Sequence, residues 1–510
     1  MKYTSTLLKA ALFATGLAGI VSEYTLSTLA TYFLGDSVFQ FTMIVSTMLF
    51  SMGLGSRISR RFEKDLLRNF VALEFTLSVL ASNITTIVYS VFAIYGETLV
   101  IIYLLSVMVG LLIGMEIPLV VRLNQQFESL KVNISSAMEN DYYGSLAGGV
   151  FFAFVGLPHL GLTYTPTVLG GINFLVAIIL LWAVWSELTE KLRKNLLWSI
   201  IVIAVVLFVS GLFSQRIVEW GDKIRYKDRV VYSEQSRYQK IVLTYGEGDY
   251  WLFLNGHQQL STMDEPLYHE PLVHPVVLLH PNPKKVLVLG GGDGAAVREL
   301  LKYDGLEKIV LVDLDPKVTE LASTHAVLLN INGGSLLDPK VQVINQDGFT
   351  FLESNKNEFD VIIADFPDPR TVDLGRLYSR EFYWLCHQSL NAEGLMVTQA
   401  GSPYYAEKAY KCINETMKAA GFNTLKLHNQ VLTLGEWGWI IGSVKQRPLK
   451  EELQEEEIPV PTQWLNQSAL TMISSFGKTV FKGPIGEVRI NRLHDPVLYR
   501  YYNAGKWDLY

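Results

Sequence analysis

Apolar stretches long enough to cross a lipid bilayer follow one another through the first 213 residues of the chain. One crossing needs about 20 mostly apolar residues. We place seven such stretches at 7–33, 38–56, 70–93, 98–121, 143–163, 167–186 and 196–213. Because further apolar stretches follow the first closely and no small-residue cleavage site separates them, the first is interpreted as a span and not as a cleavable signal peptide. The pattern predicts an α-helical polytopic membrane domain over residues 1–213.

Charge divides the chain at the same place. Residues 1–213 hold 12 Lys/Arg and 12 Asp/Glu, whereas residues 214–510 hold 31 and 37 and therefore carry the whole net charge of −6. This balance argues against nucleic acid as a partner and favours cationic ligands. Two cysteines, Cys386 and Cys412, exclude a disulfide scaffold and a cysteine-based metal cluster. The nine histidines show no ligand spacing, so we expect no metal.

The side of the membrane that holds residues 214–510 stays open. Basic residues gather in loops 57–68 and 187–195, which the positive-inside rule places in the cytoplasm together with the N-terminus. Seven crossings would then put residues 214–510 outside, but a further basic cluster at 216–229 favours the opposite arrangement.

Three acids fall inside the expected spans: Glu23, Glu74 and Glu116. The spans of Glu74 and Glu116 hold no Lys or Arg, and Lys9 in the first span lies 14 residues before Glu23. Since an ionised carboxylate in hydrocarbon is costly, such groups usually face the bundle interior. They could form a cation path, or they could be protonated groups that hydrogen-bond between helices.

The second part of the chain has the pattern of an α/β fold. Alternating residues over 226–262 predict a small antiparallel β-unit. Four continuous apolar runs then predict buried parallel strands at 285–289, 308–312, 341–344 and 359–364. Because helical segments separate these runs, residues 280–445 are expected to form a doubly wound, Rossmann-like α/β domain of the methyltransferase type.

Each of these strands ends at an acid or a glycine turn, and ligands of such sheets bind at the carboxyl ends of the strands. The turn 290–294 (GGGDG) lacks the GxGxxG form of a dinucleotide site. Asp313 lies about 20 residues further on and suits a ribose diol, and Asp347-Gly348 suits an adenine amino group. The set indicates a nucleoside pocket for an S-adenosyl sulfonium compound. Alternatively, Asp313 and Asp347 are ordinary turn residues.

These motifs, in their order along residues 229–445, resemble the spermidine synthase (polyamine aminopropyltransferase) family. The matching blocks are Tyr238-Gln239, Asp264-Glu265, Tyr268-His269-Glu270, 280–294, 313–315, Asp347-Gly348, 360–365, Asp368-Pro369 and 377–383. The preceding multi-span domain resembles the membrane-anchored branch of this family. The resemblance implies decarboxylated S-adenosylmethionine as aminopropyl donor, putrescine or a related polyamine as acceptor, and spermidine and methylthioadenosine as products, with no tightly bound cofactor. It also suggests homodimers.

The resemblance also implies roles for particular residues. An acceptor amine is mostly protonated near neutral pH, because alkyl amines have a pKa of about 10.4, so a carboxylate must take up or orient its proton. That residue is expected to be Asp365. Asp293 would hold the ammonium of the donor, and His269 and Asp368 would place the acceptor. The nucleoside would be held by Gln239, Asp313, Asp347 and Gly348, beside the turn glycines Gly290 and Gly292.

Two segments depart from the family pattern. Residues 370–376 stand where a Gly-Pro-Ala segment is usual, and residues 432–439 replace a tyrosine-bearing acceptor segment. In the second, Glu436 and Trp437 could bind an amine or belong to the scaffold. Residues 446–510 are expected to form a linker, with an acidic run at 451–457, and an aromatic tail that packs on the enzyme or lies at the membrane interface.

Other functions remain open on the sequence alone. An S-adenosylmethionine-dependent methyltransferase uses the same kind of sheet, although methyl donors carry a carboxylate that Asp293 would repel. A polyamine transporter or sensor with a ligand-binding second domain would use Glu23, Glu74 and Glu116. We expect a multi-pass protein of the cell membrane, and the cytoplasmic location of the donor favours a cytoplasmic catalytic domain.

Overall fold

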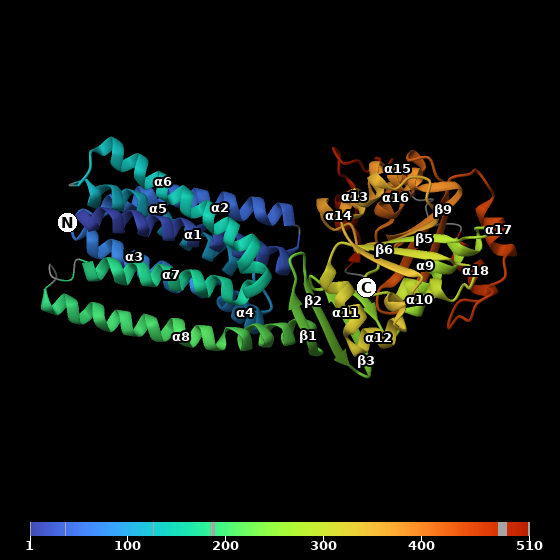
Figure 1. Ribbon diagram of the computed structural model, residues 1–510, viewed down its shortest axis with the longest axis horizontal. Helices are drawn as coiled ribbons and strands as arrows, with labels where there is room; N and C mark the ends of the chain where they lie inside the picture. Colours follow the sequence, from blue (N-terminus) through green and yellow to red (C-terminus); the bar gives the residue numbers. More distant parts are fainter. Residues whose placement is uncertain are drawn as a thin grey trace. The chain divides into compact units, whose positions relative to one another are not determined.

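The computed structural model describes residues 2–35, 37–125, 127–183, 185, 189–477 and 487–507. The chain divides into two compact units, residues 1–240 and 241–510, which Figure 1 shows in blue to green and in green to red. The division falls later than the expected boundary at residue 213. The reason is that helix α8 (Glu190–Tyr226) continues past that point and strand β1 (Arg229–Gln235) follows it within the first unit.

The first unit is a bundle of long helices. Besides α8 they are α1 (Lys2–Leu34), α2 (Ser37–Ile58), α3 (Leu66–Ser82), α4 (Ile84–Tyr95), α5 (Leu99–Asn124), α6 (Leu130–Phe151) and α7 (Gly161–Ala183). A π-helical segment, Phe152–Leu160, joins α6 to α7. In the described part of the chain, five helices are long and apolar enough to cross a membrane. The number is six if α3 and α4, which meet at a bend of 53°, form one span.

The expected count of seven spans stays a prediction. One of the five long stretches, Leu130–Trp182, has 53 residues and contains a backbone break at Gly161, where φ is +64°. The expected span 143–163 falls within this stretch, and the expected span 167–186 begins within it. The second of them runs into residues 184 and 186, which lie outside the described residues.

Glycines let the helices of the first unit approach one another closely. A Cβ atom on Gly144 of α6 would lie 2.0 Å from the carbonyl oxygen of Phe13 in α1, and one on Gly114 of α5 would lie 2.0 Å from that of Met52 in α2. Such contacts between helix backbones are typical of small residues in helical membrane bundles.

Two of the three acids that were expected inside spans face the interior of the bundle. Glu74 and Glu116 are fully buried, whereas Glu23 is only half-buried. Thr15 donates a hydrogen bond of 3.3 Å to Glu74. Within the described residues, neither carboxylate oxygen of Glu116 has a hydrogen-bond partner.

The second unit contains the expected α/β domain with an antiparallel unit before it. Strands β2 (Lys240–Gly246), β3 (Asp249–Leu254) and β4 (His257–Ser261) pair antiparallel in sequence order. The main sheet has the order β10-β11-β9-β8-β5-β6-β7. Its strands are β5 (Lys285–Gly290), β6 (Lys308–Asp313), β7 (Val341–Asn345), β8 (Phe359–Asp365), β9 (Leu390–Gly401), β10 (Asn423–Val431) and β11 (Gly435–Ser443).

The topology of the main sheet places a ligand site between β5 and β8. Strands β5 to β9 are parallel, and β10 and β11 pair antiparallel at one edge. The chain runs outward from β5 through β6 to β7, then returns to the other side of β5 through β8 and β9. The order therefore reverses between β5 and β8, and ligands of such sheets bind at this reversal, outside the carboxyl ends of the strands.

Helices flank the main sheet, and the end of the chain packs on it (Figure 1). They are α9 (Pro266–Leu278), α10 (Ala295–Leu301), α11 (Pro316–Thr324), α12 (Ala326–Asn332), α13 (Gly348–Ser354), α14 (Val372–Gly375), α15 (Arg380–Ser389), α16 (Glu407–Ala419), α17 (Leu449–Glu455), α18 (Gln467–Ile473) and α19 (Leu498–Asn503). Part of the expected acidic linker is helix α17, which buries Leu449 and Leu453. In the tail, Leu498 and Tyr502 belong to the core of the sheet, while Tyr510 lies outside the described residues.

Candidate active site

Strands β5 and β8 end side by side at the reversal point. Gly290 pairs with Asp365, and the amide of Gly291 donates to the carbonyl oxygen of Asp365 at 3.0 Å. Gly290 has a φ of +76°, and a Cβ atom there would lie 2.1 Å from that carbonyl oxygen. Only glycine therefore allows the chain to leave β5 directly beside Asp365.

Asp365 is a half-buried carboxylate that accepts a hydrogen bond from one tyrosine. The hydroxyl of Tyr268, on helix α9, donates to Oδ1 of Asp365 at 2.7 Å. Burial raises the pKa of Asp365 to about 6, although the charge of His269 and the hydrogen bond from Tyr268 oppose this rise. Asp365 is consequently ionised at neutral pH, but it is a stronger proton acceptor than an exposed aspartate.

Three predicted site residues come together from three separate elements. His269 of α9, Asp293 of the glycine turn and Asp365 of β8 each offer a ligand atom, and these atoms lie within 4.8 Å of one another. Asp293 also accepts a hydrogen bond of 2.8 Å from the amide of Ala295 at the start of α10. Two carboxylates at this spacing attract a cation, and both an ammonium group and a metal ion meet that description.

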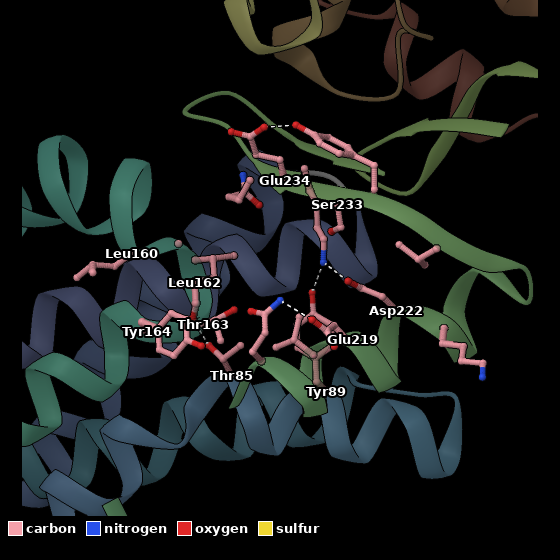
Figure 2. A pocket seen from close by; sticks show the side chains of 18 of the residues that line it. Thr85, Tyr89, Leu160, Leu162, Thr163, Tyr164, Glu219, Asp222, Ser233 and Glu234 are labelled. Atoms are coloured by element: carbon pink, nitrogen blue, oxygen red, sulfur yellow. Dashed lines mark hydrogen bonds and ion pairs between the residues drawn. The ribbon is translucent and has the colours of Figure 1, made fainter. Parts of the chain in front are cut away.

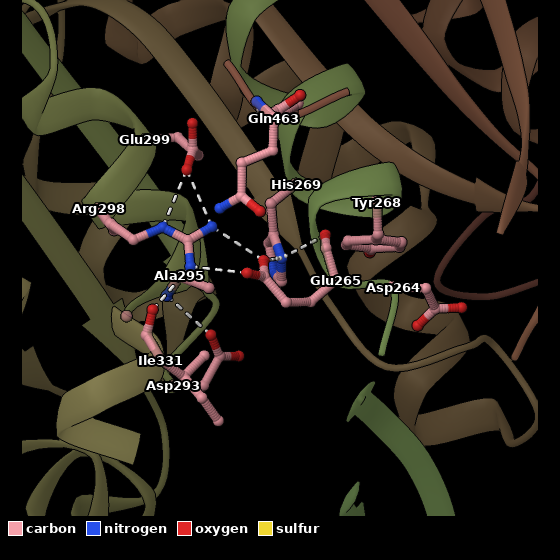
Figure 3. Close-up of polar contacts among 12 residues, drawn as sticks. Asp264, Glu265, Tyr268, His269, Asp293, Ala295, Arg298, Glu299, Ile331 and Gln463 are labelled. Carbon is pink, nitrogen blue, oxygen red and sulfur yellow. Dashed lines mark hydrogen bonds and ion pairs between the residues drawn. The ribbon is translucent and has the colours of Figure 1, made fainter. Parts of the chain in front are cut away.

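An ion-pair network behind the cluster fixes the position of His269 (Figure 3). Nδ1 of His269 lies 2.9 Å from the carboxylate of Glu265 and 3.0 Å from its carbonyl oxygen. Since both partners are acceptors, Nδ1 carries the proton and donates. Arg298 of α10 binds Glu265 with two nitrogens, at 2.7 and 2.9 Å, and also contacts Glu299 at 2.9 Å.

The network also sets the charge of His269. Burial alone would lower the pKa of His269, but the hydrogen bond to Glu265 and the charges of Glu265, Asp293 and Asp365 raise it to about 9. Burial favours neutral Glu265, yet hydrogen bonds from His269 and Arg298 outweigh it and lower the pKa of Glu265 to about 2. At neutral pH the imidazole is therefore a cation beside Asp293 and Asp365.

Asp313 ends strand β6 and faces the same glycine turn. Its two carboxylate oxygens accept hydrogen bonds from the amides of Gly292, at 3.1 Å, and Asp315, at 2.8 Å. A Cβ atom on Gly292 would lie 2.6 Å from Oδ2 of Asp313, so glycine is needed for this approach. Burial raises the pKa of Asp313 to about 6. The turn and Asp313 thus form one rigid corner at the edge of the sheet.

Asp347 lies at the start of helix α13, directly before Gly348. One of its oxygens accepts from the amide of Thr350 at 3.2 Å and caps the helix, and the other pairs with Arg376. Asp347 therefore does act as a structural residue at the start of a helix, as the alternative interpretation of the sequence expected. Arg376 belongs to the segment that departs from the family pattern, and no motif had connected it with Asp347.

Asp368 follows β8 by three residues and is engaged by the same departing segment. Nη2 of Arg370 lies 3.1 Å from its carboxylate. Gln239 lies in the first unit, directly before β2, where its carbonyl oxygen accepts from the hydroxyl of Ser236 at 3.0 Å. The expected contact of Gln239 with a nucleoside stays a prediction.

The two candidate amine contacts of segment 432–439 differ. Glu436 contacts His428 of the adjacent strand β10, so its carboxylate already has a partner in the protein. Trp437 is buried, and its indole N–H has no hydrogen-bond partner within the described residues. Two residues along, Trp439 packs edge-on against Tyr268, with ring centroids 5.4 Å apart. The sequence had not singled out Trp439.

A second buried group of acids and histidine supports the site from behind. Glu270, His274 and Glu299 also place ligand atoms within 4.8 Å of one another. His274 contacts Glu299 at 2.9 Å, and Lys302 pairs with Glu299 at 2.6 Å. The carboxylate of Glu270 accepts three backbone N–H groups, from residues 463–465, at 2.6 to 2.9 Å. These polar atoms are already satisfied, which indicates a structural role.

The first unit has a pocket of its own, of about 810 Å³ (Figure 2). It is lined by parts of α4, the π-helical segment, α7, α8 and β1, and by Lys240, the last residue of this unit. Lys240 pairs there with Asp222 at 2.5 Å and donates to the hydroxyl of Tyr89 at 3.0 Å. None of the predicted catalytic or binding residues is among those that line it.

Comparison with known proteins decides between the enzyme classes. The model of the spermine/spermidine synthase domain matches residues 265–454. The polyamine aminopropyltransferase of Leptospira interrogans is 38% identical over 96% of both chains. Polyamine aminopropyltransferase 2 of Aquifex aeolicus is 40% identical over 98% of both. The chain belongs to the spermidine synthase family. It is a spermidine synthase-like aminopropyltransferase of polyamine biosynthesis.

Solved members of the spermidine synthase family are also similar to this chain. A spermidine synthase in complex with the transition-state analogue AdoDATO is 31% identical, covers 50% of this chain and 87% of its own, and has a TM-score of 0.46. The corresponding values for the spermidine synthase of Thermotoga maritima are 31%, 50%, 87% and 0.45.

In this member of the spermidine synthase family, the sequence motifs did not identify the residues that hold the predicted site residues in place. Tyr268, Glu265 and Arg298 contact predicted residues, and the first two lie inside motifs already used for the resemblance. The i, i+4 spacing of Glu265 and His269 on one helix was the available signal for their contact. Arg298 carried no such signal, because its contact with Glu265 joins two helices 33 residues apart in the chain.

Proposed function

We propose that the chain transfers the aminopropyl group of decarboxylated S-adenosylmethionine to putrescine, giving spermidine and methylthioadenosine. The observation that carries this proposal is the meeting of Asp365, Asp293 and His269 at the carboxyl ends of β5 and β8. Both substrates are cationic chains, and the acids of this cluster provide charges of the opposite sign.

The reaction begins with a proton transfer. The acceptor ammonium gives a proton to the free oxygen of Asp365, since Tyr268 occupies Oδ1. The nitrogen lone pair then attacks the carbon next to the sulfonium, and a C–N bond forms as the C–S bond breaks. The electron pair of that bond returns to sulfur, so methylthioadenosine leaves as a neutral thioether. The new secondary amine keeps the positive charge.

The environment of Asp365 suits this step. A pKa of about 6 keeps the carboxylate ionised near neutral pH, and a base is most effective when its pKa is close to the working pH. The cationic imidazole of His269 next to it favours the neutral form of the attacking amine, because like charges repel. In this proposal His269 and Asp368 place the acceptor.

The donor occupies the glycine turn in this proposal. Asp293 holds its ammonium and Asp313 its ribose diol, with Gln239, Asp347 and Gly348 near the base and with Gly290 and Gly292 in the turn. Because Asp347 is paired with Arg376, the adenine amino group would bind next to an ion pair and not to a free carboxylate.

Product analysis of the purified full-length protein tests this proposal. With decarboxylated S-adenosylmethionine and putrescine, mass spectrometry should detect methylthioadenosine and spermidine in equal amounts. In a parallel reaction, S-adenosylmethionine replaces the decarboxylated donor. Methylated putrescine and S-adenosylhomocysteine in that reaction, without spermidine in the first, would overturn the proposal in favour of a methyltransferase.

We further propose that the first unit anchors the enzyme in the cell membrane as a multi-pass bundle, with the catalytic unit in the cytoplasm, where the donor is expected. The long apolar helices and the glycine contacts between them support this assignment. Membranes washed with sodium carbonate should retain the protein, and a cysteine introduced at exposed Asp304 should resist an impermeant maleimide in intact cells. Release of the protein by carbonate would contradict the membrane anchor. Labelling in intact cells would contradict the cytoplasmic position of the catalytic unit.

A polyamine transporter is the second candidate for the first unit, favoured by the buried acids Glu74 and Glu116. Replacing Glu23, Glu74 and Glu116 together by Gln should abolish amine uptake into proteoliposomes if these acids form a path. Unchanged uptake would exclude them from one.

A further inference from the structure

The segment after β8 carries a positive charge at a place where the proposed acceptor needs a negative one. Nη2 of Arg370 binds the carboxylate of Asp368 at 3.1 Å, and the amide of Arg370 donates to the carbonyl oxygen of Asp368 at 2.7 Å. The Asp368 side chain is only 15% exposed. An ion pair that is partly removed from water is less weakened by screening than one on the open surface.

The C-terminal segment holds Arg370 in place. The guanidinium carbon lies 5.4 Å from the ring centre of Tyr502, and Nη2 lies 3.5 Å from the hydroxyl of that residue. Asn503 donates to the carbonyl oxygen of Arg370 at 2.9 Å. Because Tyr502 is itself buried in the core of the sheet, the position of the arginine is fixed by a carboxylate, an aromatic ring and a backbone contact together.

Asp368 and Arg370 adjoin the reacting cluster. Asp368 lies three residues after Asp365, the last residue of β8, and Tyr268 is the residue that binds Asp365. Nε of Arg370 is buried and has no hydrogen-bond partner within the described residues.

We propose that Arg370 determines acceptor specificity, as a resident cation that competes with the far ammonium of a diamine for Asp368. This inference rests on the proposed function, in which Asp368 receives that ammonium. A diamine must displace the guanidinium or share the carboxylate with it, and two positive charges on one carboxylate repel each other. A monoamine of the same chain length makes no such demand. Arg370 thus weakens putrescine binding selectively and leaves the attack of the near nitrogen unaffected.

The test compares two acceptors, putrescine and butylamine, in full-length variants that each lack one arginine charge, Arg370→Gln and the control Arg380→Gln. Methylthioadenosine formation is measured at saturating decarboxylated S-adenosylmethionine, with putrescine and with butylamine. In Arg370→Gln, the KM for putrescine should fall about tenfold, the size expected when a charged hydrogen bond no longer competes, while the KM for butylamine stays within about twofold. Equal shifts for both amines, or none, would overturn the inference.

Matched variants separate charge from packing. Arg380→Gln removes the same charge ten residues along the chain, where the side chain contacts Glu381 and not Asp368, and it should shift neither KM. Arg370→Lys keeps the charge but loses the planar fork, so its putrescine KM should remain high. A low putrescine KM in Arg370→Lys would show that shape and not charge sets the preference, and would also overturn the inference.

The same data distinguish failure of this inference from failure of the proposed function. If the wild-type enzyme binds the donor in calorimetry but forms no methylthioadenosine with either amine, the proposed function fails and the inference falls with it. If the product forms and the ratio of the two KM values is the same in wild-type and Arg370→Gln, only the inference fails.

Discussion

The two units of the chain bury charged groups in different ways. In the catalytic unit, the carboxylate of Glu265 is bound by Arg298 and His269, and that of Glu270 accepts three backbone N–H groups. In the helical unit, Glu116 is equally buried, yet neither of its oxygens has a hydrogen-bond partner in the described part of the chain.

The difference shows what holds each unit together. Ion pairs in the catalytic unit fix both the position and the charge of the groups next to the substrate site, at the expense of removing those groups from water. In the helical unit, close backbone contacts at glycines such as Gly144 and Gly114 provide the packing. The buried acids Glu74 and Glu116 form no ion pair within the described residues, and the ion pair of Asp222 with Lys240 is a single contact at the end of this unit. Changes of charge should therefore disturb the catalytic unit most, and changes of volume the helical unit.

The largest effect should follow from Glu265→Gln. It leaves Arg298 without its main partner in a partly buried place, so the free energy of unfolding of the catalytic unit should fall by about 3–5 kcal/mol. Urea denaturation followed by tryptophan fluorescence measures this. Glu320→Gln breaks an exposed pair with Lys317 and should cost less than about 1 kcal/mol. Similar losses in the two variants would contradict the role given to the network.

A change of volume tests the helical unit. Gly144→Val should place a side chain against the backbone of Phe13 and destabilise this unit by about 1–3 kcal/mol. Gly53→Val adds the same side chain where nothing lies within 4 Å. Thermal unfolding in detergent should separate the two variants. Equal unfolding temperatures would mean that close contacts at glycine do not stabilise the bundle.

Tyr268→Phe tests a single hydrogen bond to the reacting carboxylate. Its loss should lower kcat about tenfold, because a hydrogen bond to a charged group is worth about 1.5–3 kcal/mol. Tyr303→Phe provides the control, since that hydroxyl contacts His274 in the supporting group and not Asp365. A wild-type kcat in Tyr268→Phe would show that Asp365 needs no such orientation.

The pH dependence should show the smallest change. Asp365 and Asp313 have pKa values raised to about 6, so protonation below that pH removes the base and weakens donor binding. The value of kcat/KM should be about half-maximal near pH 6 and fall further as pH decreases. In Glu265→Gln the positive charge of His269 is lost, and this charge lowers the pKa of Asp365 in the wild-type protein. The pH of half-maximal kcat/KM should therefore move to a higher value. An acid limb near pH 4 would contradict the effect of burial on these two residues.

The sequence predicted the parts of the molecule that follow from local pattern. Continuous apolar runs identified β5, β6, β7 and β8, and the acids after them were expected at one edge because carboxyl ends of parallel strands meet there. The structure brings Asp293 and Asp365 together at that edge, with His269 of α9 beside them. Their catalytic roles remain proposals.

Contacts between distant segments could not be read in this way. The pairing of Arg376 with Asp347 and the position of Tyr502 against Arg370 join residues 29 and 132 positions apart. No periodicity or motif encodes such pairs, because they depend on how the loop after β8 and the C-terminal segment fold onto the sheet. The bend between α3 and α4 likewise lies inside the stretch 70–93, which the sequence predicted as one span.

The central claim is that Asp365 accepts the proton of the acceptor amine. The most direct test is single-turnover formation of methylthioadenosine by Asp365→Asn, compared with Asp304→Asn at an exposed turn. We expect donor affinity to be retained in both variants. Turnover should fall at least about a hundredfold in Asp365→Asn alone. Turnover of Asp365→Asn at the wild-type rate would contradict the account.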